Sequence, residues 1–422
     1  PGQTHLTLHD EALGTTPKLG IYLPYVLLPP SSYAVLDALK PQAATSYSFV
    51  DIMATRAHYE DAFRRLHQDR FGISQDMTLL AGSQRQADLR ADRTSNNGLQ
   101  AWLASTRALG GTGLHYLSFA DEPNLNYPDF ASFQQVFQSM AAQVRADPAN
   151  ARAGVRIAIP ASSRFINGPL AENAADKRGI DWARRLLATS ADQIDALAWH
   201  EWMIRDLLAT RVYRNSVRQA AQLVGLNSQG RPRKALLLDQ TNMSSGSSLS
   251  PYDQETHYAA LWWTSVAINA SADGWLDMLN WFMLVDEPEY PKGMVRMLDN
   301  QRFELKPVGL AQQFIQQHWL DQVLRLDNDA FEVDALAMAT GEQRSLLGVN
   351  KSTRAHQVSL DGTVCPQPRM TLMYFGADNR SRSVPFDCKA GQVGFLLPGE
   401  TVFALSWTAP LSPQPATRQE AP

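Results

Sequence analysis

The chain has 422 residues, of which 44% are hydrophobic, and a formal net charge of −4. This length favours two domains over one, and the composition suffices for a large buried core. Lys and Arg are scattered, the longest basic stretch lying at 231–234, which argues against a nucleic-acid partner. No apolar run reaches the about 18 residues that a membrane span needs.

Eight short apolar segments bounded by polar turns are predicted to be strands buried on both faces. They lie at 19–26, 44–52, 77–81, 114–120, 155–159, 194–199, 235–238 and 275–282. Amphipathic patterns predict helices between them, at 58–67, 130–144, 181–188, 204–224 and 253–268. The alternation predicts an α/β fold, a (β/α)8 TIM barrel over 19–321. An open doubly wound sheet is disfavoured, because the first strand lacks a Gly-rich phosphate turn.

The pattern changes after the predicted barrel. Short alternating segments separated by Gly, Asn and Asp predict a small C-terminal antiparallel β-sandwich domain over 322–409. Residues 1–18 also alternate and are expected to pair with that domain, whereas the Pro-rich stretch 410–422 is expected to be a disordered tail.

The two cysteines, Cys365 and Cys388, both fall in the predicted β-domain. We expect them to form a disulfide, which would place the protein in the periplasm or outside the cell; two reduced, buried thiols are the alternative. The sequence begins at Pro1, which we interpret as the removal of a signal segment.

Chemistry in such a barrel sits where the strands end, so the residues after each strand are the candidates. The fourth strand is followed by Asp121-Glu122-Pro123-Asn124. A carboxylic acid held there in a partly dry pocket can donate a proton, although a helix-capping turn would use the same residues.

Aromatic residues accompany polar ones at later strand ends. The sixth strand ends in Trp199-His200-Glu201-Trp202, the seventh in Asp239-Gln240-Thr241-Asn242, and the eighth carries Trp281. Indole rings can stack on the apolar faces of sugars while polar groups bind the hydroxyls, but core packing is the commoner fate of a single Trp or His. The histidines show no metal-ligand spacing apart from the pair His5 and His9, so we expect neither metal nor cofactor.

This order of motifs resembles the retaining (β/α)8-barrel glycoside hydrolases, and most of all glycoside hydrolase family 39 and the related glycosidases of bacterial exopolysaccharide clusters. In that family an Asn-Glu-Pro follows strand four with the Glu as acid/base, matched here by Glu122. A nucleophilic Glu follows strand seven, where this chain has Gln240. The aromatic and His end of strand six matches 199–200, the Trp of strand eight matches Trp281, and a Lys-Pro before the last helix matches 306–307.

Two departures from the family pattern stand at the expected centre. Asp121 replaces the Asn before the acid, and an ionised Asp cannot donate a hydrogen bond to a sugar hydroxyl. Gln240 replaces the nucleophile, and an amide cannot form the glycosyl ester. Three interpretations are open: an engineered Glu-to-Gln change, a natural pseudoenzyme that still binds glycan, or Asp239 as nucleophile in a register shifted by one. Since such a shift turns a strand side chain to the other face, Asp239 and Gln240 are not both expected in the site.

The resemblance implies a retaining glycoside hydrolase, which we expect to be endo-acting, on a bacterial extracellular or periplasmic polysaccharide. The rival hypothesis is a non-catalytic glycan-binding pseudoglycosidase of an exopolysaccharide export or biofilm system. The expected catalytic residues are Glu122 with Gln240 or Asp239. The expected substrate contacts are Asp121, Asn124, His200, Glu201, Trp202, Trp281, Tyr25 and Tyr127.

Overall fold

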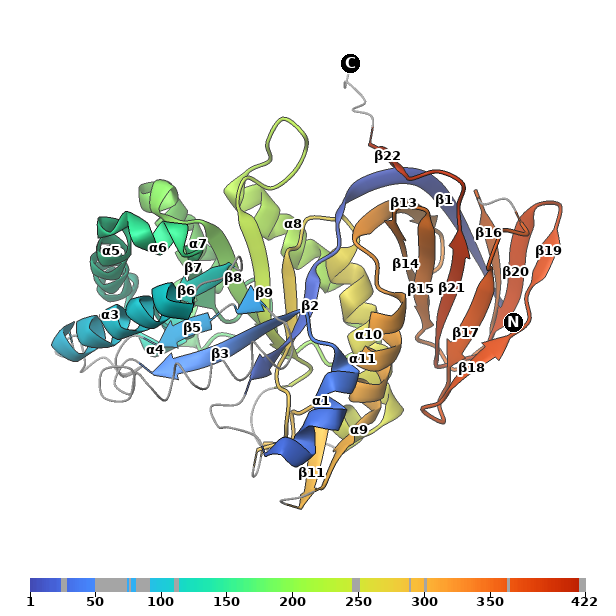
Figure 1. Ribbon diagram of the computed structural model, residues 1–422, viewed down its shortest axis with the longest axis horizontal. Helices are drawn as coiled ribbons and strands as arrows, with labels where there is room; N and C mark the ends of the chain where they lie inside the picture. The colour runs from blue at the N-terminus through green and yellow to red at the C-terminus, as the bar shows by residue number, and fades with distance from the viewer. Residues whose placement is uncertain are drawn as a thin grey trace.

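The computed structural model describes residues 1–23, 29–49, 74–75, 77–80, 92–109, 114–244, 251–287, 290–299, 302–362 and 365–416. A barrel unit and a β-domain lie side by side along the long axis of the molecule (Figure 1). Tyr25, the helix expected at 58–67 and the last residues of the expected tail lie outside the described residues.

Eight parallel strands of the described chain close into a barrel. They are β2 (Lys18–Leu23), β3 (Ala43–Phe49), β5 (Met77–Leu80), β6 (His115–Ser118), β7 (Val155–Ser162), β8 (Ala196–Trp202), β9 (Ala235–Asn242) and β10 (Met278–Trp281). The short strand β4 (Ser74–Gln75) adds to β3. The ring closes because β2 pairs with both β3 and β10.

The barrel strands are apolar on both faces because each face packs against a different layer. Small side chains such as Ala158, Ala196 and Ala198 fill the narrow lumen. Larger residues of the same strands, such as Leu197 and Leu236, point outward and pack under the helices. This double burial is what makes parallel strands read as continuous apolar runs.

Helices surround the barrel. They are α1 (Tyr33–Leu39), α3 (Asp92–Leu109), α4 (Pro123–Asn126), α5 (Phe130–Ala146), α6 (Pro148–Arg152), α7 (Gly179–Ser190), α8 (Val212–Val224), α9 (Pro251–Glu255), α10 (His257–Ser271) and α11 (Pro307–His318). Short 3-10 turns lie at η1 (Pro30–Ser32), η3 (Glu172–Lys177), η4 (Ala191–Gln193) and η5 (Leu207–Ala209). No helix in the described ranges combines the length and the apolarity of a membrane span.

The β-domain is one large, mostly antiparallel sheet. Its strands are β1 (Gly2–Thr15), β13 (Gln322–Asn328), β14 (Val333–Thr340), β15 (Gln343–Asn350), β16 (His356–Asp361), β17 (Thr371–Phe375), β18 (Ser381–Val384), β19 (Asp387–Lys389), β20 (Gln392–Leu397), β21 (Thr401–Thr408) and β22 (Gln414–Pro415). The N-terminal strand β1 lies between β13 and β16. A separate hairpin, β11 (Val295–Asp299) and β12 (Arg302–Leu305), precedes α11.

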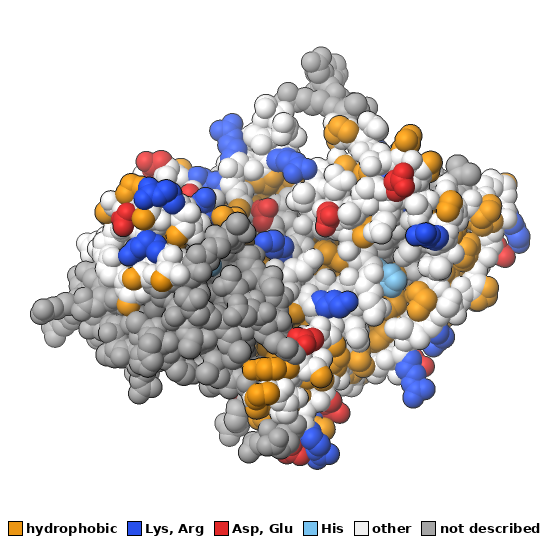
Figure 2. All heavy atoms as spheres, viewed as in Figure 1, with side chains coloured by type: hydrophobic (Ala, Val, Ile, Leu, Met, Phe, Trp, Pro, Cys, Tyr) orange, Lys and Arg blue, Asp and Glu red, His pale blue; other side chains and the backbone are white. Residues whose placement is uncertain are grey.

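The two units share a core. Helix α10 is buried along almost its whole length, because it contacts α8 and α11 on one side and β14 and β15 of the β-domain on the other (Figure 1). Within the β-domain, Cys365 and Cys388 form a disulfide with a Cα–Cα distance of 5.6 Å. On the face drawn in Figure 2, charged side chains of both signs are interspersed.

The predicted fold class is confirmed: a (β/α)8 barrel is joined to a mostly antiparallel β-domain. The main difference in the barrel concerns β9, which continues through Asn242 where the sequence pattern ended the strand at 238. The polar residues 239–242 are therefore part of a barrel strand rather than of a loop after it.

Candidate active site at the barrel mouth

Glu122 is held at the end of β6 by the local backbone. It precedes Pro123, the first residue of α4, and has φ 46° and ψ 56°, a left-handed conformation that few residues other than Gly adopt. Its backbone N–H donates to Ala161 O at the end of β7, at 3.0 Å. Asn126 donates its side-chain N–H to Asp121 O at 2.9 Å. The sequence Asp-Glu-Pro-Asn thus forms a fixed turn that aims both carboxylates at the mouth.

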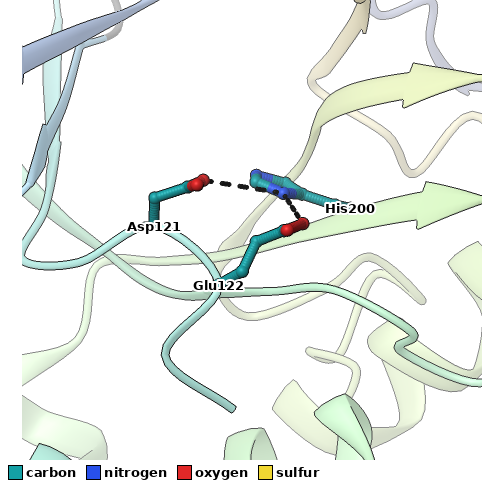
Figure 3. Close-up of side chains that lie close together, drawn as sticks. All are labelled: Asp121, Glu122 and His200. Carbon is teal, nitrogen blue, oxygen red and sulfur yellow. Dashed lines mark hydrogen bonds and ion pairs between the residues drawn. The ribbon is translucent and has the colours of Figure 1, made fainter. Parts of the chain in front are cut away.

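His200 lies at the centre of the site. Its Nδ1 is 3.0 Å from Glu122 Oε2 and 3.9 Å from Asp121 Oδ1, and its Nε2 is 3.4 Å from Asp239 Oδ1. Figure 3 shows Asp121 and Glu122, on the loop after β6, pointing toward the imidazole on β8. The structure therefore brings together residues from the ends of β6, β8 and β9.

The carboxylates decide the charge of this histidine. Burial by itself lowers the pKa of His200, but Asp239 and Glu122 raise it, and the net pKa lies well above its usual value. The neighbouring carboxylates therefore favour the protonated imidazole over the neutral one.

Asp239 and Gln240 both point into the lumen, contrary to expectation. The pairing of β8 with β9 shifts by one residue, from Trp199 opposite Leu238 to His200 opposite Gln240. Asp239 is the extra residue of this β-bulge. Gln240 shares the inward face of its partner His200, and Asp239 contacts that same imidazole. The bulge removes the strict alternation on which the expectation rested.

An aromatic cluster borders the carboxylates. Tyr22, Trp202 and Phe282 pack together from the ends of β2, β8 and β10, with ring centroids 4.6 Å apart for Tyr22 and Phe282 and 5.4 Å for Trp202 and Phe282. Lys292 places its ammonium 5.4 Å from the centre of the Trp202 ring and donates to Ser244 O. Burial, with help from Arg205, lowers the pKa of Lys292 to about 8. Neither Phe282 nor Lys292 was singled out from the sequence.

Two predicted contact residues point away from the mouth. Glu201 is fully buried against α8, where it accepts a hydrogen bond from Ser216 Oγ at 2.6 Å. Burial raises the pKa of Glu201 to about 7. Trp281 is also fully buried, between Trp262 and Trp263 of α10, at 5.9 and 5.4 Å between ring centroids. Both expectations were wrong, because these residues occupy the outward-facing positions of their strands.

Asn124 and Tyr127 also have structural roles. Asn124 is fully buried, donates to Ser163 O at 2.8 Å and to Lys177 O at 2.9 Å, and accepts from Ser163 N. Tyr127 is 9% exposed and packs edge-on against Phe133. The expected glycan contact of Asn124 is therefore corrected, because its side chain is fully engaged with backbone groups.

The same residues form a possible metal-binding group. One ligand atom each from Asp121, Glu122 and His200 lie within 4.8 Å of one another. A doubly protonated imidazole has no lone pair for a metal, however, and the raised pKa of His200 favours that form. A metal ion would therefore have to compete with the proton for His200.

Comparisons with solved structures define the fold class more closely. The family 51 arabinofuranosidase from Xanthomonas axonopodis pv. citri matches with a TM-score of 0.70 and 12% identity, covering 96% of this chain and 100% of that chain. The α-L-arabinofuranosidase of Thermotoga maritima gives 0.69 and 10%, with the same coverage. The family 30 endoxylanase of Clostridium papyrosolvens C71 gives 0.64 and 12%, covering 97% and 100%.

The sequence itself matches no protein-family model and no curated protein. At these identities the structural likeness shows the fold alone. That fold is the barrel with a β-rich partner domain found in glycoside hydrolases of families 51 and 30.

Proposed function

We propose that this chain is a glycoside hydrolase in which Glu122 protonates the oxygen of the scissile glycosidic bond. The observation that carries the proposal is the line from Glu122 through His200 to Asp239, at 3.0 and 3.4 Å. Most glycoside hydrolases use two carboxyl groups that flank the scissile bond, and in a barrel these groups lie at the mouth. His200 contacts both carboxyl groups of this site, through a hydrogen bond with Glu122 and an ion pair with Asp239.

The surroundings of the carboxyl groups suit a sugar. The rings of Tyr22, Trp202 and Phe282 are buried against one another and form an apolar layer at the strand ends, which would lie behind the C–H face of a bound pyranose or furanose. The carboxylate of Asp121, 3.9 Å from His200 Nδ1, can accept a hydrogen bond from a sugar hydroxyl, whereas the ammonium of Lys292 is buried and donates to Ser244 O. This combination of a few polar groups with an aromatic wall is typical of a binding site for a small polar ligand.

The substrate class we propose is a polysaccharide. The structural neighbours are named as arabinofuranosidases and xylanases, so arabinan, arabinoxylan and xylan are the first candidates. The resemblance to family 39 and to exopolysaccharide-cluster glycosidases adds a bacterial exopolysaccharide. The disulfide between Cys365 and Cys388 supports a periplasmic or secreted location, where such polymers occur.

The test is hydrolysis by the chain and by a Glu122→Gln variant. Reducing-end release should be measured on arabinan, arabinoxylan, xylan and bacterial exopolysaccharide preparations. Loss of the proton donor should lower kcat by about 10²–10⁴-fold. Glu172→Gln, a change of an exposed Glu in η3, is the matched control and should leave kcat unchanged. Equal activity of the Glu122→Gln and Glu172→Gln variants would rule out Glu122 as the acid.

A second candidate, the non-catalytic glycan-binding protein, is favoured by one observation. Gln240 occupies the position that matches the nucleophilic Glu of the retaining glycoside hydrolases which this sequence resembles. This candidate predicts that the chain does not hydrolyse any glycan. It also predicts that calorimetry detects glycan binding and that Glu122→Gln leaves the affinity unchanged. Detectable turnover that depends on Glu122 would exclude it.

A further inference from the structure

A cavity of about 400 Å³ lies where the barrel unit meets the β-domain, and none of the described residues at the barrel mouth lines it. Helices α8 and α10 form one wall of this interdomain cavity, and β13 and β14 form the other, beside the two helices in Figure 1. Pockets that hold small molecules have volumes of about 300–1,000 Å³. The interdomain cavity is therefore large enough for one small ligand.

The wall on the β-domain side is open because β13 and β14 separate. The two strands pair with each other only at 322–324 and 337–339. Beyond that point, 326–328 pair with β1 and 333–336 pair with β15, on the sides that face away from the gap. Backbone polar groups that lack a strand partner need water or a ligand to satisfy them. The interdomain cavity therefore has polar backbone along one wall.

Asn269 of α10 lines the interdomain cavity and offers it a buried acceptor. Its Nδ2 donates to Ser265 O at 2.8 Å and to Asp334 Oδ2 at 3.1 Å, which fixes the orientation of the amide. The residue is 8% exposed, and its Oδ1 has no hydrogen-bond partner among the described residues. A buried amide oxygen without a partner is costly unless a ligand or water donates to it. A hydroxyl group of a ligand would meet this need.

Cationic side chains outnumber anionic ones in the lining. Arg211, Arg214 and Arg325 contribute three guanidinium groups, against the carboxylates of Asp327 and Asp334. Both carboxylates already accept hydrogen bonds from other side chains of the protein. The lining therefore favours a ligand that carries a negative charge.

The guanidinium groups keep donors in reserve. Within the described chain, the polar contacts of Arg211 and of Arg214 involve only Nε and Nη2. Arg325 is half exposed and makes no hydrogen bond to a described residue, and its nearest carboxylate is that of Glu11, at 3.7 Å from Nη1. Guanidinium N–H groups bind carboxylates in a planar, paired geometry. The arginines can therefore hold a carboxylate at the entrance of the interdomain cavity.

We propose that the interdomain cavity is a second saccharide-binding site and that it takes a sugar unit carrying a carboxylate, as in a uronic acid of an acidic polysaccharide. The carboxylate pairs with the guanidinium groups, a hydroxyl donates to Asn269 Oδ1, and Leu13 and Ile268 contact the C–H groups of the ring. A sulfate ion fits less well, because it has no proton to donate to Asn269. The choice of a saccharide rests on the proposed function, whereas binding here requires no turnover.

The test is isothermal titration calorimetry on the Glu122→Gln chain, in which turnover is suppressed. The probes are trigalacturonic acid, a glucuronate-bearing xylo-oligosaccharide, neutral xylotriose and sodium sulfate. Adding Arg325→Ala should lower the affinity for an acidic oligosaccharide by about 10- to 100-fold, because a charge-assisted contact is lost. The affinity for xylotriose should not change.

Arg382→Ala is the matched control. The two arginines are 50% and 49% exposed, and each lies near one carboxylate, at 3.7 Å for Arg325 and 3.5 Å for Arg382. Arg382 is on β18, outside the lining of the interdomain cavity, so its removal should leave every affinity unchanged.

Three results would overturn the proposal: no binding of either acidic oligosaccharide, equal affinities in the Arg325→Ala and Arg382→Ala variants, or sulfate binding as tightly as the acidic oligosaccharides. Hydrolysis that depends on Glu122, found together with any of these, would remove the second site and leave the proposed function standing. An acidic oligosaccharide that binds and loses affinity with Arg325→Ala would support the second site even if the chain hydrolyses nothing.

Discussion

Two neighbouring residues of β8 lie in different environments, one in the barrel lumen and one in the layer between the strands and the helices. The two environments favour opposite charge states of these residues. His200 faces the lumen and Glu201 faces α8, and both are almost completely buried. The pKa of each is raised, but for different reasons. Asp239 and Glu122 raise the pKa of His200 and favour its charged form, whereas burial raises the pKa of Glu201 to about 7 and favours its neutral form. Equal burial therefore does not give equal chemistry, because opposite charges outweigh burial at His200, whereas at Glu201 burial outweighs the opposite charge of Arg178.

The largest effect is expected from His200→Ala. This change leaves Glu122 and Asp239 without the cation between them, and breaking a buried pair in this way costs about 3–5 kcal/mol of unfolding free energy. Because the folded pKa of His200 lies above its unfolded value near 6.5, the stabilisation is complete below that pH and is lost as the pH rises toward the folded pKa.

Urea unfolding of the wild type and the variant, at pH 6 and in steps toward alkaline pH, measures this effect. The two curves should differ most at pH 6 and converge as the pH rises. His9→Ala, at a surface ion pair with Asp327, is the control and should show little change. A difference that stays constant with pH would mean that the His200 contribution is packing rather than charge.

Glu201→Gln tests the opposite face of the same strand. The folded pKa of Glu201, about 7, exceeds its ordinary 4.5, so stability is highest below pH 4.5 and falls as the pH rises through 7. The penalty at pH 8 is on the order of 3 kcal/mol. In the variant this part of the pH dependence should vanish, while kcat on the glycan stays within a few-fold. Parallel stability curves from pH 4 to 8 would argue against a neutral buried Glu201, and a large drop in kcat would place it in the site.

The disulfide extends the comparison to the β-domain, away from the mouth. Replacing Cys365 and Cys388 by Ser releases a loop of 23 residues and should lower the unfolding free energy by about 3 kcal/mol. Hydrolysis at temperatures where the variant is folded should be unchanged, because neither cysteine lies near the barrel lumen. Parallel urea unfolding and activity measurements decide the matter. A loss of kcat in a fully folded variant would mean that the β-domain controls the site directly.

The sequence predicted the barrel because its strands are buried on both faces and are separated by polar turns. The position at a strand end was also enough to identify Glu122 and His200 as candidate site residues. The structure places their side chains 3.0 Å apart. Both features depend on patterns that are local in the chain. The order of the motifs, which carried the resemblance, is likewise readable from one sequence.

Side-chain direction was harder to predict. The bulge at Asp239 breaks alternation and depends on hydrogen bonding between β8 and β9, which no local pattern encodes. Glu201 and Trp281 are of residue types that suit a sugar site, yet they occupy outward-facing positions. Lys292 lies in an irregular segment after β10 and reaches the mouth only through tertiary packing against Trp202.

The smallest effect is expected from Asn124→Ala, which tests whether a polar residue beside the acid binds glycan or supports the turn. Its side chain bonds the backbone of Ser163 twice and that of Lys177 once. Removing these bonds leaves buried backbone groups without partners and should cost about 1–3 kcal/mol. KM should change little, since the side chain is fully buried. Urea unfolding and glycan titration of this variant, beside Asn173→Ala at an exposed position of η3, separate the two roles. If the variant bound glycan more weakly while its free energy of unfolding was unchanged, Asn124 would be a substrate-binding residue after all.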